Sequence, residues 1–135
     1  MRPRTPQSLA ILMGCILMTG VPAAAQKPDD ETRLYLTELT LPFPREASVE
    51  ATQRGMAQGQ KIMSRVHQCE DLLAEARSIE GATAGALPVM RAGDLKPNRR
   101  MYEEVPKLAP GGAAGPFRVA EGFQIIALCS KSDGK

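Results

Sequence analysis

Cysteine and histidine are the side chains of this sequence best suited to metal, redox or nucleophilic chemistry, and both are scarce. Cysteine occurs three times, and His67 is the single histidine. A zinc site needs several such ligands at short spacings, and the sequence contains no CxxC pair. A histidine without a paired nucleophile supports no catalytic triad. We therefore expect no metal, no cofactor and no catalysis by His67.

Two of the cysteines, Cys69 and Cys129, remain if an N-terminal signal that contains Cys15 is removed. An even pair in an exported protein favours a disulfide. Closing a loop of about 60 residues would stabilise the fold by about 4 kcal/mol in the chain-entropy model. The alternative is two buried, unpaired thiols.

The N-terminus has the pattern of a cleavable secretory signal. Arg2 and Arg4 precede an apolar run over residues 9–18, and Ala23–Ala25 offers a cleavage site. A run of this length is about half of what a transmembrane helix needs, so no membrane anchor is expected. Cleavage is favoured over lipidation at Cys15, because the apolar run continues past that residue. Residues 1–25 are thus predicted to be a signal peptide and the location to be the periplasm.

The net charge and length of the chain after removal of the predicted signal peptide narrow the classes of protein to which it can belong. The basic residues fall from 17 to 15 (17 minus Arg2 and Arg4), which balances the 15 acidic ones. A neutral chain with three Phe and two Tyr lacks the footprint of a nucleic-acid-binding protein. About 110 residues form one domain. We divide them into a flexible leader (26–32), the domain (33–131) and a tail (132–135).

Hydrophobic periodicity predicts the elements of the first half. Alternating leucines predict a strand over 34–41, ended by Pro42 and Pro44. Apolar residues at spacings of three and four predict helices over 46–66 and 69–79.

The second half has weaker patterns and one clear hairpin. We expect a loop over 81–86, a short edge strand over 87–90, a helix over 97–108 opened by Pro97, and strands over 115–120 and 123–129 joined at Glu121-Gly122. The order β-α-α-β-α-β-β predicts the α+β class, a small antiparallel sheet with packed helices.

Three stretches carry a resemblance to the parvulin family of peptidyl-prolyl isomerases, whose fold is also FKBP-like, and to periplasmic SurA-type folding factors. Residues 36–42 resemble the first strand of the family, and Leu108-Ala109-Pro110-Gly111 resembles its L-x-x-G turn. Residues 115–128, Gly-Pro-Phe-Arg-Val-Ala-Glu-Gly-Phe-Gln-Ile-Ile-Ala-Leu, resemble its terminal S-x-P-x-x-[ST]-x-x-G-[FY]-H-[IV]-I hairpin. The likeness spans residues 33–131.

Departures from the family pattern fall on its active site. Glu38 and Gln124 stand where the family usually carries histidines, and Gly85-Ala86-Leu87-Pro88 replaces G-G-x-L-G. Met101 stands where the family has an apolar groove residue, usually Phe. The resemblance makes Glu38 and Gln124 degenerate catalytic positions, while each is alternatively a solvent-facing strand residue. It makes four residues candidates for substrate contact: Met90, Met101, Phe117 and Phe123.

The resemblance implies a periplasmic isomerase or chaperone domain, monomeric, that binds proline-containing or extended segments of unfolded envelope proteins, such as outer-membrane protein precursors. Loss of the histidines implies weak or absent turnover. The rival is a non-catalytic structural or interaction module whose groove is filled by its own side chains.

Overall fold

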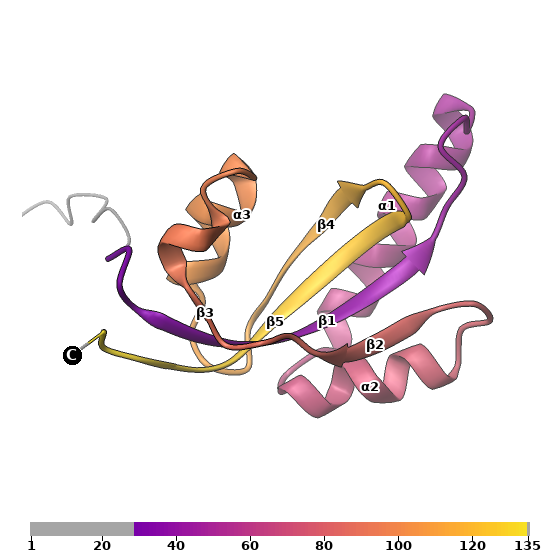
Figure 1. The fold of residues 1–135 in the computed structure, drawn as a ribbon. Helices are drawn as coiled ribbons and strands as arrows, with labels where there is room; N and C mark the ends of the chain where they lie inside the picture. Colours follow the sequence, from indigo (N-terminus) through magenta and orange to yellow (C-terminus); the bar gives the residue numbers. More distant parts are fainter. Residues whose placement is uncertain (1–28, 135) are drawn as a thin grey trace, which may run out of the picture.

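The structure, a computed structural model, describes residues 29–134 (Figure 1). Their elements follow the predicted order, except that two short strands stand where one was expected. The predicted signal peptide and Cys15 lie outside the described residues. The elements are β1 (Arg33–Pro42), α1 (Val49–Arg65), α2 (Cys69–Arg77), β2 (Thr83–Ala86), β3 (Met90–Arg91), the 3-10 helix η1 (Ala92–Leu95), α3 (Arg99–Glu104), the 3-10 helix η2 (Val105–Lys107), β4 (Ala113–Val119) and β5 (Gly122–Ser132).

The first and last strands of the domain are neighbours in one antiparallel sheet, as predicted. The strand order is β2-β1-β5-β4, and β3 pairs with the beginning of β1. The register places Glu38 opposite Ile126 and Thr40 opposite Gln124. The predicted α+β class, with a small antiparallel sheet and packed helices, is confirmed.

Each face of the sheet has its own core, because alternate residues of a strand point to opposite sides. The face that packs against α1 and α2, here the α1–α2 face, buries Leu39, Leu41, Ile62, Val66, Cys69, Leu72, Phe123, Ile125 and Ala127. The face that packs against η1 and α3, here the α3 face, buries Leu34, Leu36, Ala92, Leu95, Met101, Val105, Ala114, Phe117, Ile126 and Leu128. Figure 1 shows α3 at one end of the sheet and α1 and α2 at the other.

Helix α1 begins where the sequence supplies a cap and packs closely because of two glycines. The hydroxyl of Ser48 accepts a hydrogen bond from the backbone N–H of Ala51, at 3.1 Å. Gly55 and Gly59 are buried, and a β-carbon would overlap the ring of Phe123 at the first and of Pro116 at the second. These glycines set how near α1 lies to the hairpin.

The segment between α2 and α3 differs from the prediction. Residues 83–86, expected in a loop, form β2 and pair with Thr37–Thr40, whereas the expected strand over 87–90 shrinks to β3, opposite Arg33 and Leu34. Small residues carry no hydrophobic alternation, so the pattern missed β2. Pro88 interrupts the ladder because it has no N–H to donate.

The helix predicted over 97–108 is shorter than expected. Asn98, not Pro97, is its N-cap, and its side-chain oxygen accepts from the N–H of Met101 at 3.2 Å. Pro106 falls in η2 and ends the α-helical hydrogen bonding after Glu104. Met101 and Val105 point into the core, as predicted.

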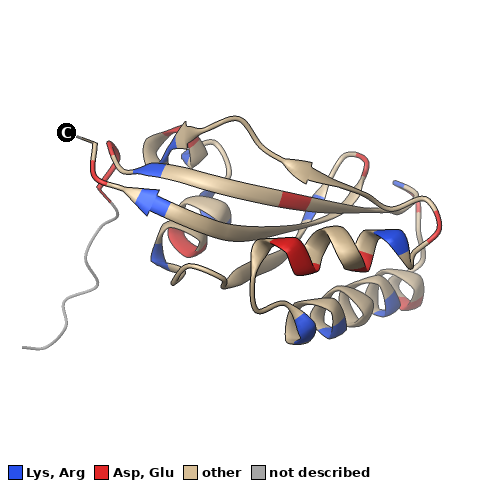
Figure 2. Cartoon of the chain, turned by 90° about the horizontal axis from the view of Figure 1, so that it is seen from below, with Lys and Arg blue, Asp and Glu red and all other residues tan. Residues whose placement is uncertain are grey.

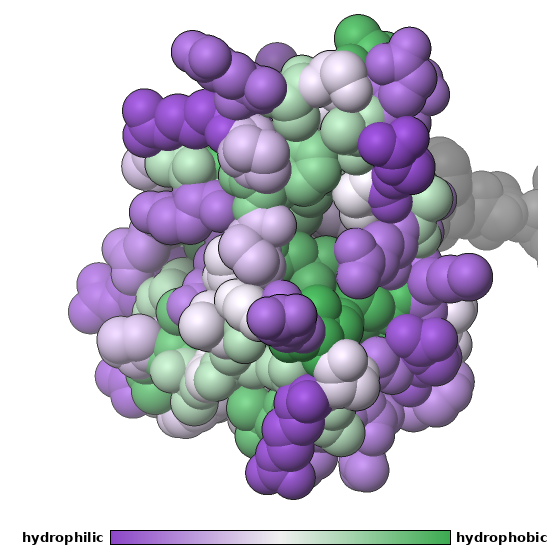
Figure 3. All heavy atoms as spheres, turned by 90° about the vertical axis from the view of Figure 1, so that its right-hand side faces the viewer, coloured by the Kyte–Doolittle hydropathy of each residue, from purple (hydrophilic) through white to green (hydrophobic). Residues whose placement is uncertain are grey.

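The surface of the domain is mixed in charge. In the view from below, acidic and basic residues are interspersed over the helices (Figure 2). Figure 3 faces the end of the sheet at which β1 ends. In this view, apolar side chains gather in a central hollow that hydrophilic side chains surround. No helix within residues 29–134 has the length and apolar character needed to cross a bilayer.

Candidate functional site

The structure brings Glu38 and Gln124 together on the α3 face of the sheet, although they are 86 residues apart in sequence. They lie on the neighbouring strands β1 and β5, two residues out of register, so both side chains leave the same face. The side-chain N–H of Gln124 donates a hydrogen bond to a carboxylate oxygen of Glu38. Both residues are half-buried.

Two apolar candidates lie in the core on the same face of the sheet as this polar pair. Phe117 of β4 is directly opposite Gln124 in the register and shares the α3-face core with Met101 of α3. Met101 is 8% exposed and Phe117 is 2% exposed. The guanidinium of Arg100 lies over the ring of Phe117, 5.1 Å from its centroid. Met90 is half-buried and packs at the edge of the same core.

Phe123 does not belong to this set. It neighbours Gln124 in the chain and therefore points to the opposite side of β5. Its ring is 1% exposed and lies in the α1–α2 core, with its centroid 5.0 Å from that of Phe43. The resemblance placed it by its position in the hairpin, without regard to which face of the strand it occupies.

The α3 face is open at one point beside the polar pair. Gly85 of β2 is opposite Glu38, and a β-carbon built there meets no atom within 4 Å. Thr40, the next residue of β1 on this face, is half-buried. The site thus has a bare stretch of sheet with a carboxylate and an amide at its centre, next to an apolar wall. Such a surface can hydrogen-bond a ligand through the carboxylate and the amide.

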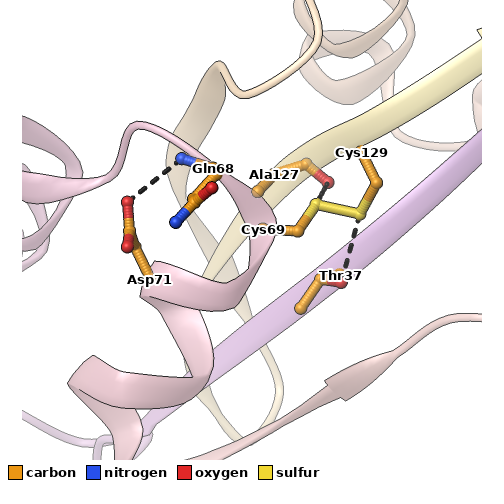
Figure 4. Close-up of a disulfide and its surroundings, with 6 residues drawn as sticks. All are labelled: Thr37, Gln68, Cys69, Asp71, Ala127 and Cys129. Carbon is orange, nitrogen blue, oxygen red and sulfur yellow. Dashed lines mark hydrogen bonds between the residues drawn. A yellow bond between two sulfur atoms is a disulfide. The ribbon is translucent and has the colours of Figure 1, made fainter.

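Cys69 and Cys129 form a disulfide with a Cα–Cα distance of 5.4 Å (Figure 4). It joins the first residue of α2 to β5, across the α1–α2 face. The hydroxyl of Thr37 in β1 lies 3.3 Å from the sulfur of Cys129, and donates to it because a disulfide sulfur carries no proton. Three elements distant in sequence therefore meet at this bond.

His67 lies apart from the polar pair, in the turn between α1 and α2. Its side chain is exposed, and its backbone N–H donates to Asp71 at 2.8 Å. This hydrogen bond, together with one from the N–H of Gln68, lowers the pKa of Asp71 and closes the first turn of α2. The hydrogen bond between His67 and α2 is therefore made by the backbone of His67 and not by its imidazole.

A cluster that the sequence did not indicate anchors the beginning of the chain. Asp30 accepts a hydrogen bond from the hydroxyl of Tyr102 at 2.5 Å and pairs with the ammonium of Lys96 at 2.7 Å. The backbone oxygens of Asp30 and Thr32 accept from Gly93 and Ala92. These contacts hold residues 29–32, the described part of the predicted leader, against η1 and α3.

Acid should release this anchor. The pKa of Asp30 is held below its usual 3.8, first by the hydrogen bond from Lys96 and then by that from Tyr102. A lowered pKa stabilises the folded protein above the unfolded value, and that contribution is lost as pH falls through the folded pKa. We expect stability to fall on acidification below about pH 4, and to fall less in D30N. Urea unfolding at a series of pH values measures this; equal pH dependence in both proteins would contradict it.

No protein-family model matches the sequence, and no curated protein matches it by sequence. Among solved structures, the chain is similar to the crystal structure of a PpiC-type peptidyl-prolyl cis-trans isomerase domain, with a TM-score of 0.55 and 22% identity. The match covers 78% of this chain and 96% of that domain. The fold is therefore parvulin-like, the class that the terminal hairpin and the strand order had indicated.

Proposed function

We propose that this protein is a periplasmic parvulin-like domain that binds extended or proline-containing segments of unfolded envelope proteins, and that its isomerase turnover is weak or lost. The proposal rests mainly on the hydrogen-bonded Glu38–Gln124 pair, which lies on the open part of the α3 face. These are the two positions where the resemblance expects histidines. The parvulin-like fold supports the class of protein.

The chemistry of this pair argues against efficient turnover. Prolyl isomerisation needs no nucleophile, because the barrier of about 18–20 kcal/mol comes from amide resonance. A catalyst must favour the twisted amide through a dry pocket and well-placed polar groups. A carboxylate beside a carbonyl oxygen repels it, and one N–H of Gln124 is already donated to Glu38. The site can therefore hold a peptide without favouring its twisted state.

A protease-coupled assay with a proline tetrapeptide tests the catalytic part of the proposal. We expect the isomerisation rate with the purified protein to remain within about twofold of the uncatalysed rate, since the polar groups oppose the transition state. A concentration-dependent acceleration well beyond this would contradict the loss of turnover.

The binding part is tested by closing the open stretch of the α3 face. In G85L, the added side chain would occupy the space beside Glu38, and the backbone of Gly85 is not in the left-handed region. We expect a labelled, unfolded proline-containing segment of an outer-membrane protein to bind the unmodified protein saturably and G85L at least tenfold more weakly. Q58L adds the same side chain to an exposed position of α1 and should bind as the unmodified protein does.

The second candidate function is a non-catalytic interaction module with its groove filled from within. The burial of Met101 and Phe117, to 8% and 2% exposure, favours it because little of either side chain is left for a ligand. In that case the titration shows no saturable change and G85L makes no difference.

The periplasmic location rests on residues 1–25 and on the disulfide, which suits an oxidising compartment. Fractionation of cells that produce the full chain would test it. The protein should appear in the periplasmic fraction without residues 1–25, and a protein that stays in the cytoplasm with residues 1–25 attached would contradict it.

A further inference from the structure

Strand β2 has a free edge on the side away from β1. The N–H of Leu87 donates to the oxygen of Leu36 at 2.9 Å, which makes these two residues a hydrogen-bonded pair. In an antiparallel ladder such pairs alternate, so the N–H and C=O groups of Ala84 and Ala86 point away from β1. Within residues 29–134 no backbone group pairs with this edge.

A shallow cavity of about 340 Å³ lies between this edge and helix α2. Its walls are the side chains of Leu73, Ala76, Arg77, Ala82 and Ala84. Figure 1 shows α2 running below β2. Ala84 is opposite Leu39 in the register, so the cavity opens on the α1–α2 face. A side chain from a strand added to β2 would enter the cavity from that face.

The cavity combines exposed apolar surface with one unpaired positive charge. Leu73 is 36% exposed, so part of its side chain is open to a ligand. Arg77 makes no ion pair with any residue of the 29–134 range. A ligand that fits must bring an aliphatic group for Leu73 and a carboxylate for Arg77.

We propose that the edge of β2 and this cavity form a second binding site, which takes an extended polypeptide segment by strand addition. The free N–H and C=O groups of Ala84 and Ala86 require a polypeptide backbone as the partner. An aliphatic side chain of the segment enters the cavity, and an acidic side chain two residues along, on the same face of the added strand, pairs with Arg77.

This site is separate from the polar pair of the proposed function. Glu38 and Gly85 lie on the α3 face, whereas Ala84 and the cavity lie on the α1–α2 face. The segment needs no proline, because it is recognised through edge hydrogen bonds, which a proline would remove. The two sites can therefore be tested independently.

Fluorescence anisotropy with the purified protein and the labelled peptide Thr-Thr-Val-Thr-Asp-Thr-Thr, blocked at both ends, tests the proposal. We expect saturable binding with a dissociation constant of about 0.1–1 mM, as the small contact area allows. In R77E the affinity should fall about tenfold, since an attraction becomes a repulsion. A peptide with Lys in place of Asp should bind R77E better than it binds the unmodified protein.

Two controls decide the outcome. R54E makes the same change on the exposed part of α1 and should bind as the unmodified protein does. N-methylation of the peptide bonds on the edge that faces β2 should abolish binding. N-methylation of the alternate bonds, on the opposite edge of the peptide, should not. The proposal is overturned if no saturable binding occurs, if R77E and R54E behave alike, or if methylation weakens binding at neither edge of the peptide.

Discussion

Reduction of the Cys69–Cys129 disulfide should lower the free energy of unfolding by about 4 kcal/mol. The bond closes a loop of 60 residues, and opening it gives the unfolded chain more conformations. For a domain of this size the loss corresponds to a fall in melting temperature of about 20 °C. Thermal unfolding followed by circular dichroism, with and without a dithiol reductant, measures the difference.

The double variant C69A/C129S separates the bond from other effects of the reductant. It should melt where the reduced protein melts, and the reductant should not shift it further. Cys69 begins α2, so amide hydrogen exchange in α2 should increase more than in the β4–β5 hairpin. A change in melting temperature under about 5 °C would show that the loop is already constrained by packing alone.

Replacement of Phe123 by alanine should cost about 3–5 kcal/mol, the range for a fully buried phenylalanine. Its ring is 1% exposed, contacts the ring of Phe43, and lies 5.1 Å from the guanidinium of Arg118. Arg118 in turn donates hydrogen bonds to backbone oxygens of Pro44 and Gly122. The substitution would therefore loosen the turn between β1 and α1 as well as the core.

This substitution also tests the side of β5 on which Phe123 lies. F123L, which retains an apolar side chain, should lose less stability than F123A and should bind peptide at the α3 face as the unmodified protein does. F43A, at a half-buried position, provides the matched comparison and should cost less than F123A. A loss of peptide binding in F123L without loss of stability would place Phe123 in the binding surface after all.

Local signals predicted most of the elements correctly. The periodicity of α1 and α2 reflects one buried face of each helix. The leucines of β1 are buried on both faces of the sheet, and their regular spacing is likewise visible in the order of the residues. The terminal hairpin was predicted from its Gly122 turn and two flanking apolar runs. These elements are recognisable because each one buries large side chains at a regular spacing.

The elements that the sequence did not indicate depend on neighbours distant in the chain. β2 consists of Thr and small residues, and it is a strand because β1 offers it a ladder of hydrogen bonds. Asp30 belongs to a polar stretch broken by proline, and it is fixed by Lys96 and Tyr102 more than 60 residues away. No local pattern contains that information.

Some features of the candidate site likewise follow from the sequence, and others follow only from the tertiary structure. The sequence alone determined which residue types stand at positions 38, 101, 117 and 124, and hence that a carboxylate, an amide and apolar groups are available. Only the tertiary structure decided that Glu38 bonds Gln124, that Phe117 joins them and that Phe123 does not. The physical reason is that the face of a strand to which a residue belongs is set by register, and register is set by the packing of both sheet faces at once.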